Sequence, residues 1–388
     1  MNKYFIGALT VCGTLSLGAC SDDNKNDNPN PDSSLSAKET MLREVARDYV
    51  EHNVLPTYEA MADAAIELFE LVETMQTKHE AGTLTQADIK AACDAWKASR
   101  KNWELSESFL FGPAGDYNID PHIDSWPLDK AAMDRLLDQI RKGNDYSIDT
   151  NLGYGLLGFH SIEYMLFELS KDGNTSLTHS TDYTPEELVY LALVSEDLRN
   201  QCVCLEASWA GTDNVSAAKQ AILEDAELDK EKNYGWMMAN AGQAGSIFKT
   251  YQEVAEEILQ GCIDIADEVG NTKIGRPHSA SSAEDRNYIE SPYSLNSIED
   301  FVDNIISIRN SYCGAVSGDA SVSDYVASVD ADLDKRVRNT IEDVIATIQL
   351  IPEPLAKNAT SAAAGAAVQA AGDDLVSVLE EAYQVVVR

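Results

Sequence analysis

Residues Thr184 to Gly211 read T-P-E-E-L-V-Y-L-A-L-V-S-E-D-L-R-N-Q-C-V-C-L-E-A-S-W-A-G, a stretch that carries the signals for both ends of one helix. Thr184 is a favoured N-cap residue, Pro185 suits the first turn, and Glu187 completes a capping box. Gly211 is typical of the position just beyond a helix. The stretch therefore predicts a single long helix, and we place a domain boundary near its end.

Helical periodicity continues along most of the chain. Ser36 and Glu39 form a capping-box pattern that opens a helix, and Pro56 is expected to kink or break that helix. The other helices are expected at residues 85–111, 128–140, 152–169, 234–267, 298–312, 322–350 and 359–387, with a long polar loop at 271–296. Alternating strand patterns are missing from the sequence. It therefore predicts an all-α protein of two helical bundles, residues 36–211 and residues 212–388.

The N-terminus has the pattern of a lipoprotein signal peptide. Lys3 precedes an apolar stretch at residues 4–17 that is too short for a mature membrane anchor, and L-G-A-C at 17–20 is a lipobox-type cleavage site. We expect residues 1–19 to be removed and Cys20 to be lipidated. Residues 20–35 are rich in Asn, Asp and Pro and are expected to form a flexible tether. A plain secretory signal with a chance cysteine is the alternative.

The residues after Cys20 and the overall charge bear on location and partners. Ser21 argues against retention in an inner membrane, and the pair Asp22-Asp23 resembles the export signal of bacterial surface lipoproteins. We expect an outer-membrane lipoprotein displayed at the cell surface, with the periplasmic face as the alternative. No second stretch is apolar and long enough to span a membrane. The formal net charge of −36 disfavours nucleic acid as a partner and favours cations, or solubility alone.

His160 and Glu163 stand three residues apart in a stretch that is otherwise mostly apolar or small. On a helix this spacing places an imidazole and a carboxylate on one face, and both bind divalent or ferric ions. A hydrogen-bonded core histidine is the alternative. Glycine costs up to about 1 kcal/mol in a helix, so glycines here suggest close backbone packing or approach to a ligand. The stretch contains Gly153, Gly155 and Gly158.

Two further segments are rich in carboxylates. In residues 96–113, Glu104 shares a helical face with Glu107 and with Arg100, among four aromatic residues. The spacing alone favours a solvent-exposed Arg–Glu pair beside an aromatic core stripe. In residues 116–129, which contain two prolines, three side chains are within reach of a cation and Asp129 is expected to cap the next helix. These three are Asp120, His122 and Asp124.

Together these motifs resemble the imelysin family. G-F-H-S-I-E at 158–163 matches its GxHxxE motif, and S-E-S-F-L-F-G-P at 106–113 and I-D-S-W-P-L-D at 123–129 match other signature blocks. In the second half, K-I-G-R-P at 273–277, E-S-P-Y-S at 290–294 and D-N-I at 303–305 are also similar to the family. The resemblance covers nearly all of the mature chain.

The resemblance implies two helical bundles related by duplication, with a site in the cleft between them. It implies a metal site made by His160 and Glu163 with the acidic partners Glu104, Glu107 and Asp124. Glu290 and Ser291 would face them from the second bundle, although this chain has Pro292 where an Arg is common in relatives. Arg100 is a further site candidate, because it shares the helical face of Glu104.

The family resemblance implies two kinds of function. Relatives are implicated in bacterial iron uptake, and the founding member was described as an insulin-cleaving protease. A zinc peptidase usually needs three protein ligands, commonly in H-E-x-x-H or H-x-x-E-H, and Tyr164 leaves the second motif incomplete. One imidazole with several carboxylates better suits iron, manganese or calcium.

We therefore expect a non-enzymatic lipoprotein that binds iron, another divalent or trivalent cation, or an iron complex. The lipid anchor at Cys20 would hold it on the membrane, and uptake-system proteins would be its partners. A metallopeptidase is the first alternative, with Glu163 or Glu107 as general base. A module that binds haem or an acidic polysaccharide is the second.

Overall fold

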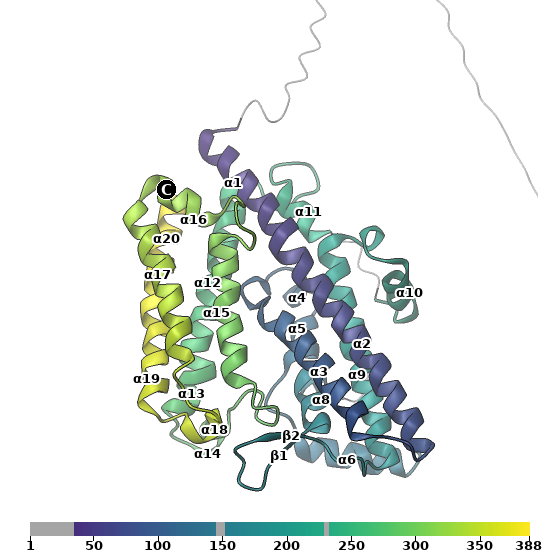
Figure 1. Ribbon diagram of the computed structural model, residues 1–388. Coiled ribbons are helices and arrows are strands. Elements are labelled where there is room, and N and C mark those ends of the chain that lie inside the picture. The colour runs from purple at the N-terminus through teal and green to yellow at the C-terminus, as the bar shows by residue number, and fades with distance from the viewer. Residues whose placement is uncertain (1–34, 145–151, 229–232) are drawn as a thin grey trace, which may run out of the picture. The chain divides into compact units, whose positions relative to one another are not determined.

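The long helix predicted at residues 184–211 begins and ends where its caps place it. Helix α9 (Pro185–Ala210) follows Thr184, whose capping box with Glu187 is complete, and it ends at Gly211, which has a φ of +88°. The computed structural model describes residues 35–144, 152–228 and 233–388. Most of these residues are helical (Figure 1), which confirms the all-α prediction. The expected signal peptide, the lipidation site at Cys20 and the tether up to residue 34 lie outside the described residues.

The first helices follow one another without a break. Helix α1 (Ala37–Asp48) continues into the π-helical segment η2 (Tyr49–Val54) and then into α2 (Leu55–Glu80). Of the expected kink or break at Pro56, the break is wrong, because this proline occupies the first turn of α2, where its missing N–H and its ring are tolerated. Glu39 also has a role that its capping-box pattern did not predict. Its carboxylate accepts hydrogen bonds from the backbone N–H groups of Tyr251 and Gln252.

Three long helices form the core of the first half. Helices α2, α3 (Gln86–Glu104) and α9 pack side by side (Figure 1). They bury large aromatic side chains, among them Tyr58, Trp96, Trp103 and Trp209. Shorter elements surround these helices: η3 (Glu107–Phe109), α4 (Pro113–Asp116), α5 (Ile119–Asp124), α6 (Lys130–Arg141), η4 (Tyr154–Leu156) and α8 (Gly158–Leu166).

The expected helix at residues 152–169 is much shorter in the structure. Helix α8 begins at Gly158, which has a φ of +71°, a backbone conformation that separates it from the preceding 3-10 turn η4. It ends before strand β1 (Phe167–Leu169), which pairs antiparallel with β2 (Ser176–Thr178). Both His160 and Glu163 remain on the helix, so their predicted common face is retained.

The second half is built around helices α12 (Tyr251–Asp267), α15 (Ser297–Cys313), α17 (Ala331–Ile348) and α20 (Val376–Val387), which pack on one another. Three elements that follow Gly211 pack on α9 instead: η5 (Thr212–Asn214), α10 (Ala217–Asp225) and α11 (Tyr234–Ala239). The remaining elements of the second half are η6 (Glu268–Ile274), α13 (Gly275–His278), α14 (Ala283–Arg286), α16 (Val322–Val329), α18 (Leu355–Asn358), α19 (Ala362–Gln369) and η7 (Ala370–Leu375).

Three expected helices of this half are interrupted. The helix expected at 234–267 is divided into α11 and α12. The helix expected at 322–350 is divided at Asp330, whose side chain caps α17 by accepting from the N–H of Leu333. The third, expected at 359–387, contains the π-helical segment η7. The loop expected at 271–296 contains the end of η6 together with α13 and α14.

Elements from the two halves meet in the interior. Residues 37–388 form one compact unit, in which α3 packs against α15 and η3 packs against α12. The domain boundary near Gly211 therefore stays a prediction. No helix within the described ranges combines the length and the apolar composition that crossing a membrane requires.

Candidate functional site

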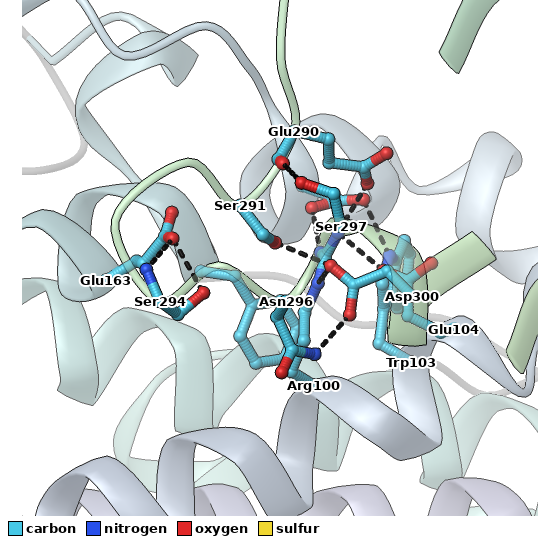
Figure 2. Close-up of polar contacts among 12 residues, drawn as sticks. Arg100, Trp103, Glu104, Glu163, Glu290, Ser291, Ser294, Asn296, Ser297 and Asp300 are labelled. Atoms are coloured by element: carbon cyan, nitrogen blue, oxygen red, sulfur yellow. Dashed lines mark hydrogen bonds and ion pairs between the residues drawn. The ribbon is translucent and has the colours of Figure 1, made fainter. Parts of the chain in front are cut away.

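Arg100 lies at the centre of a buried group of charges. It is on α3, it has no exposed surface, and its guanidinium contacts four carboxylates (Figure 2). Nη2 lies 2.5 Å from Oε1 of Glu104 and Nε lies 3.4 Å from Oδ2 of Asp300. The guanidinium also pairs with Asp124 and Glu290. The solvent-exposed Arg100–Glu104 pair that the spacing favoured is therefore wrong, because both residues are completely buried and α15 packs on α3.

Lys273 is the second cation of this group. It is on η6, it is 1% exposed, and its ammonium lies among three carboxylates. Nζ is 3.2 Å from Oε1 of Glu107, 3.3 Å from Oε1 of Glu290 and 3.6 Å from Oε2 of Glu104. Burial alone lowers the pKa of Lys273, but the surrounding carboxylates outweigh burial and raise it well above the usual value.

Asp124 joins Arg100 to His160. Its Oδ1 pairs with Arg100 and lies 3.0 Å from Nε2 of His160, while its Oδ2 accepts a hydrogen bond of 2.8 Å from Nε1 of Trp103. Burial alone raises the pKa of Asp124, but the charge of Arg100 and the contact with His160 lower it below its usual range. Asp124 is thus an ionised carboxylate at neutral pH.

His160 lies between two carboxylates rather than in an apolar core. Its Nδ1 is 3.4 Å from Oε2 of Glu163, on the opposite side of the ring from Asp124. Burial alone lowers the pKa of His160, but the contacts with Asp124 and Glu163 raise it to about 9. At neutral pH both ring nitrogens are therefore protonated and the side chain is a cationic imidazolium. It has to lose one of these protons before it can bind a metal ion.

Glu163 holds the loop that precedes α15. Its Oε1 accepts hydrogen bonds from the N–H of Tyr293 at 2.9 Å and from the N–H and Oγ of Ser294, both at 2.7 Å (Figure 2). The same loop has two non-glycine residues in the left-handed region, Ser291 with φ +50° and Leu295 with φ +56°. Such backbone conformations persist only when the surroundings hold them. Glu163 thus positions this loop against α8.

Asp300 binds two other residues of the same loop. Its Oδ2 accepts a hydrogen bond of 2.5 Å from Oγ of Ser291, and its Oδ1 accepts one of 2.5 Å from Nδ2 of Asn296. Glu290, at the start of the loop, accepts at its backbone oxygen from Oγ of Ser297. Glu290 therefore pairs with Arg100 of α3, Ser291 and Asp300 pair beside it, and the role of Glu290 and Ser291 at a metal site stays a prediction.

Gly158, the first residue of the GxHxxE motif, allows the close approach of α8 to α5. A Cβ at this position would lie 2.0 Å from the backbone oxygen of Ile123, the residue before Asp124. The positive φ of Gly158 is a second reason for glycine here. The motif glycine therefore brings the backbone that carries His160 next to the backbone that carries Asp124.

Carboxylates outnumber cationic side chains in this group, which we call the acidic cluster. Its carboxylates are Glu104, Glu107, Asp124, Glu163, Glu290 and Asp300, and its permanent cations are Arg100 and Lys273. Burial raises the pKa values of Glu104, Glu107 and Asp300, although the cations oppose the increase. Oε2 of Glu290 is buried and accepts no hydrogen bond from the described residues, whereas Oε1 of Glu104 is held by its ion pair with Arg100.

Several ligand sets in the acidic cluster have the spacing of a metal site. In each set, ligand atoms of three residues lie within 4.8 Å of one another. The sets are Asp124–His160–Glu290, Glu104–Glu107–Asp124 and Glu104–Glu290–Asp300. Four of the five residues expected to bind metal thus belong to at least one set. The fifth, Glu163, belongs to none of those found among the described residues, and its Oε1 is already occupied by three donors.

A cavity of about 330 Å³ adjoins the acidic cluster at Glu107. Its lining includes the carboxylates of Asp120, Glu257, Asp264 and Glu268. Burial, followed by the charge of Asp124, raises the pKa of Asp120 to about 6.

His122 and Asp129, also singled out in the segment 116–129, do not line this cavity. His122 lies beside Asp197, with Nδ1 3.3 Å from Oδ2. Asp129 caps α6 by accepting from the N–H of Ala132, which confirms the role expected for it.

Lys273 and Asp300 were not among the predicted site residues. Lys273 is the first residue of K-I-G-R-P, so a signal for it was present in a block that resembles the family. Asp300 stands four residues after Asn296 at the start of α15, where an acidic residue also suits the helix N-terminus. The sequence pattern around Asp300 is the same whether this residue only favours the helix N-terminus or is a buried counter-ion of Arg100.

Comparisons with known proteins agree with this architecture. Iron-regulated protein A from Synechococcus elongatus is 25% identical over 345 residues, which are 87% of this chain and 84% of that protein. A solved structure described as an iron-regulated protein A precursor from Parabacteroides distasonis is 28% identical, with a TM-score of 0.74, and the match covers 91% of this chain and 97% of that one.

A second solved structure supports the fold alone. An imelysin-like protein from Psychrobacter arcticum 273-4 is 15% identical, with a TM-score of 0.57, over 90% of this chain and 94% of that one. The family model described as Imelysin matches residues 54–382, a range that contains every residue of the acidic cluster. The chain therefore belongs to the imelysin family.

Proposed function

We propose that this chain binds iron, or another hard divalent or trivalent cation, in the acidic cluster. The observation that carries the proposal is the excess of buried carboxylates over fixed cations, with Oε2 of Glu290 free of hydrogen bonds from the described residues. Unpaired buried carboxylate oxygens are costly unless a proton or a cation neutralises them. A bound cation would replace protons that the raised pKa values of Glu104 and Glu107 retain there.

The donor set fits a hard cation better than zinc. Carboxylate oxygens predominate, one imidazole is present, and a thiolate is absent from the three ligand sets of the described cluster. Oxygen-rich sites suit iron, manganese, magnesium and calcium, whereas zinc favours sulfur and nitrogen ligands. The name iron-regulated protein A, which two relatives carry, makes iron the first candidate for the cargo.

The biological setting of the proposal comes from the N-terminal sequence. A lipid on Cys20 would anchor the chain to the outer membrane, on the cell surface or on the periplasmic face. The acidic cluster would then capture iron, or an iron complex, outside the cytoplasm and deliver it to uptake-system proteins. The formal net charge of −36 favours attraction of cations toward the protein.

Binding is favoured over peptidase chemistry by the state of Glu163. A general base needs an oxygen that reaches the attacking water. In Glu163, Oε1 accepts three hydrogen bonds and Oε2 faces the protonated His160. Tyr164, at the position of the second histidine of an H-x-x-E-H motif, pairs with Lys130. Chelator-sensitive cleavage of a protein substrate, absent in Glu163→Ala, would reverse this preference.

The test is a titration of the chain from residue 21 onward. Fe²⁺ under anaerobic conditions, and Mn²⁺ as a redox-stable probe, are titrated into the wild type and into the double variant Glu104→Gln, Glu290→Gln. We expect the double variant to lose at least roughly tenfold in affinity, because two charged ligands become neutral. Glu299→Gln is the matched control, since Glu299 is an exposed acidic residue on α15. Equal affinity in all three proteins, or no binding at all, would contradict the proposal.

A further inference from the structure

The ammonium of Lys273 lies among carboxylates that belong to the candidate ligand sets. It is surrounded by Glu104 and Glu107 from the first half of the chain and by Glu290 from the second half. These three carboxylates belong to the ligand sets of the acidic cluster. The amino group is therefore a tethered single positive charge inside a group of oxygens that suits a multiply charged ion.

Lys273 is held less tightly than Arg100. A charge-assisted N–H···O bond is usually about 2.7–2.9 Å long. The contacts of Lys273 span 3.2–3.6 Å, and the longest, to Glu104, is an ion pair without a hydrogen bond. Arg100 approaches Glu104 to 2.5 Å and lies over the ring of Phe159, 5.3 Å from its centroid. Of the two cations, Lys273 is thus the one whose departure breaks the weaker contacts.

A cavity next to Lys273 could accept its displaced ammonium group. Glu107, which it contacts at 3.2 Å, lines the acidic cavity of about 330 Å³. Glu268, in the same segment η6, lines this cavity too and is among the charges that act on Lys273. A lysine has a flexible four-carbon stem, so its ammonium can exchange one set of carboxylates for another without a change in the backbone.

We infer that Lys273 is an internal counter-cation that holds the ligand carboxylates together in the metal-free protein and leaves them when a multiply charged cation binds. This inference rests on the proposed function. The displacement would also select multiply charged ions. A monovalent ion would only replace the single positive charge of the Lys273 ammonium, so the exchange would give no electrostatic gain. A divalent or trivalent ion supplies the additional charge that the carboxylate excess requires.

The direct test measures whether the amino group of Lys273 becomes accessible. The wild-type chain from residue 21 onward is treated briefly with an amine-reactive acylating reagent, with and without saturating Mn²⁺, and labelled peptides are quantified by mass spectrometry. We expect labelling of Lys273 to increase at least roughly fivefold with Mn²⁺, since it moves from a buried to a solvated site. Lys90, an exposed lysine paired with Asp94 on α3, is the internal control and should not change.

A substitution gives a second measurement. Lys273→Met keeps the length of the stem and removes the charge, so Mn²⁺ should bind at least roughly tenfold more tightly than to wild type, provided that the variant gives a native circular dichroism spectrum. Lys90→Met should bind Mn²⁺ as wild type does.

The outcomes separate the two proposals. Mn²⁺ binding with unchanged labelling of Lys273 in the wild type would overturn the displacement and leave the proposed function standing. Tighter binding by Lys273→Met without increased wild-type labelling would likewise mean that Lys273 opposes the ion from a fixed position. Failure of the wild type and of both lysine variants to bind Mn²⁺ or Fe²⁺ would remove the proposed function and the inference together.

Discussion

Nε2 of His160 lies 3.0 Å from Oδ1 of Asp124, and this contact joins the helix of the GxHxxE motif to the guanidinium of Arg100. The pKa of His160 is raised to about 9, whereas a histidine in an unfolded chain has a pKa of about 6.5. The imidazolium therefore stabilises the metal-free fold. This contribution is complete below a pH of about 6.5 and is lost as the pH rises through about 9.

The protonation of His160 predicts how cation binding depends on pH. A cation near Asp124 competes with the imidazolium, so we expect the affinity for Mn²⁺ to rise between pH 7 and pH 9 as His160 loses its proton. Isothermal titration at several pH values in this range measures the slope. In His160→Gln the slope should be smaller, because the titrating group is gone. An identical slope in both proteins would show that His160 takes no part in binding.

The burial of Asp303 predicts a pH-dependent gain in stability. Its Oδ2 accepts no hydrogen bond from the described residues, and Oδ1 lies 3.9 Å from Nζ of Lys101. Burial raises the pKa of Asp303 to about 7, so its ionisation destabilises the fold increasingly as the pH rises from about 4 to about 7. Asp303→Asn should raise the free energy of unfolding by about 1–3 kcal/mol at pH 8 and much less at pH 4.5.

Urea denaturation at the two pH values checks this prediction for Asp303. Asp343→Asn removes an exposed carboxylate from α17 and should change little at either pH. A gain from Asp303→Asn of the same size at both pH values would point to the amide's hydrogen bonds rather than to the lost charge.

The geometry around Arg100 predicts that lysine cannot replace it. The guanidinium reaches carboxylates on four sides, whereas a lysine ammonium is a point charge with three donors. Arg100→Lys should therefore lower the free energy of unfolding by about 3 kcal/mol or more, because buried carboxylates lose their partner. The neighbouring Lys101→Arg, at a half-exposed position, should change it by less than about 0.5 kcal/mol. Similar stabilities of the two variants in urea would contradict this role of Arg100.

Local signals in the sequence predicted the helical class and the ends of α9, but neither the interruptions of several helices nor the burial of charges. Thr184 and Gly211 set the ends of α9 because caps depend on neighbouring residues. The i,i+4 spacing likewise placed Arg100 and Glu104 on one face of α3. That this face is buried depends on α15, about 200 residues later in the sequence, and no local pattern contains that information.

The spacing of the motif residues did not predict the role of each one. The pair His160 and Glu163 was predicted as two metal ligands on one helical face. The structure gives Glu163 three hydrogen-bond donors from the loop at Tyr293 and Ser294, a contact across 130 residues. Lys273 lies in a block that resembles the family, but lysine side chains are usually exposed, so the local sequence does not predict its burial among carboxylates.

Among the glycines of residues 152–169, only Gly158 combines a positive φ with a close backbone neighbour. A Cβ there would lie 2.0 Å from the backbone oxygen of Ile123, and its φ of +71° disfavours every other residue type. Gly158→Ala should therefore lower the free energy of unfolding by about 2–4 kcal/mol, through strain and overpacking. It should also weaken Mn²⁺ binding, because α8 would move away from the segment that carries Asp124.

Gly153 supplies the matched control. Its φ is −69°, and a Cβ at this position would have no atom of the described residues within 4 Å. Gly153→Ala should therefore be neutral or stabilise the fold by up to about 1 kcal/mol, since alanine restricts the unfolded chain. Urea denaturation of both variants, followed by Mn²⁺ titration of each at equal folded fraction, makes the comparison. If Gly158→Ala matched Gly153→Ala in both measurements, the approach of α8 to α5 would not be what the motif glycine provides.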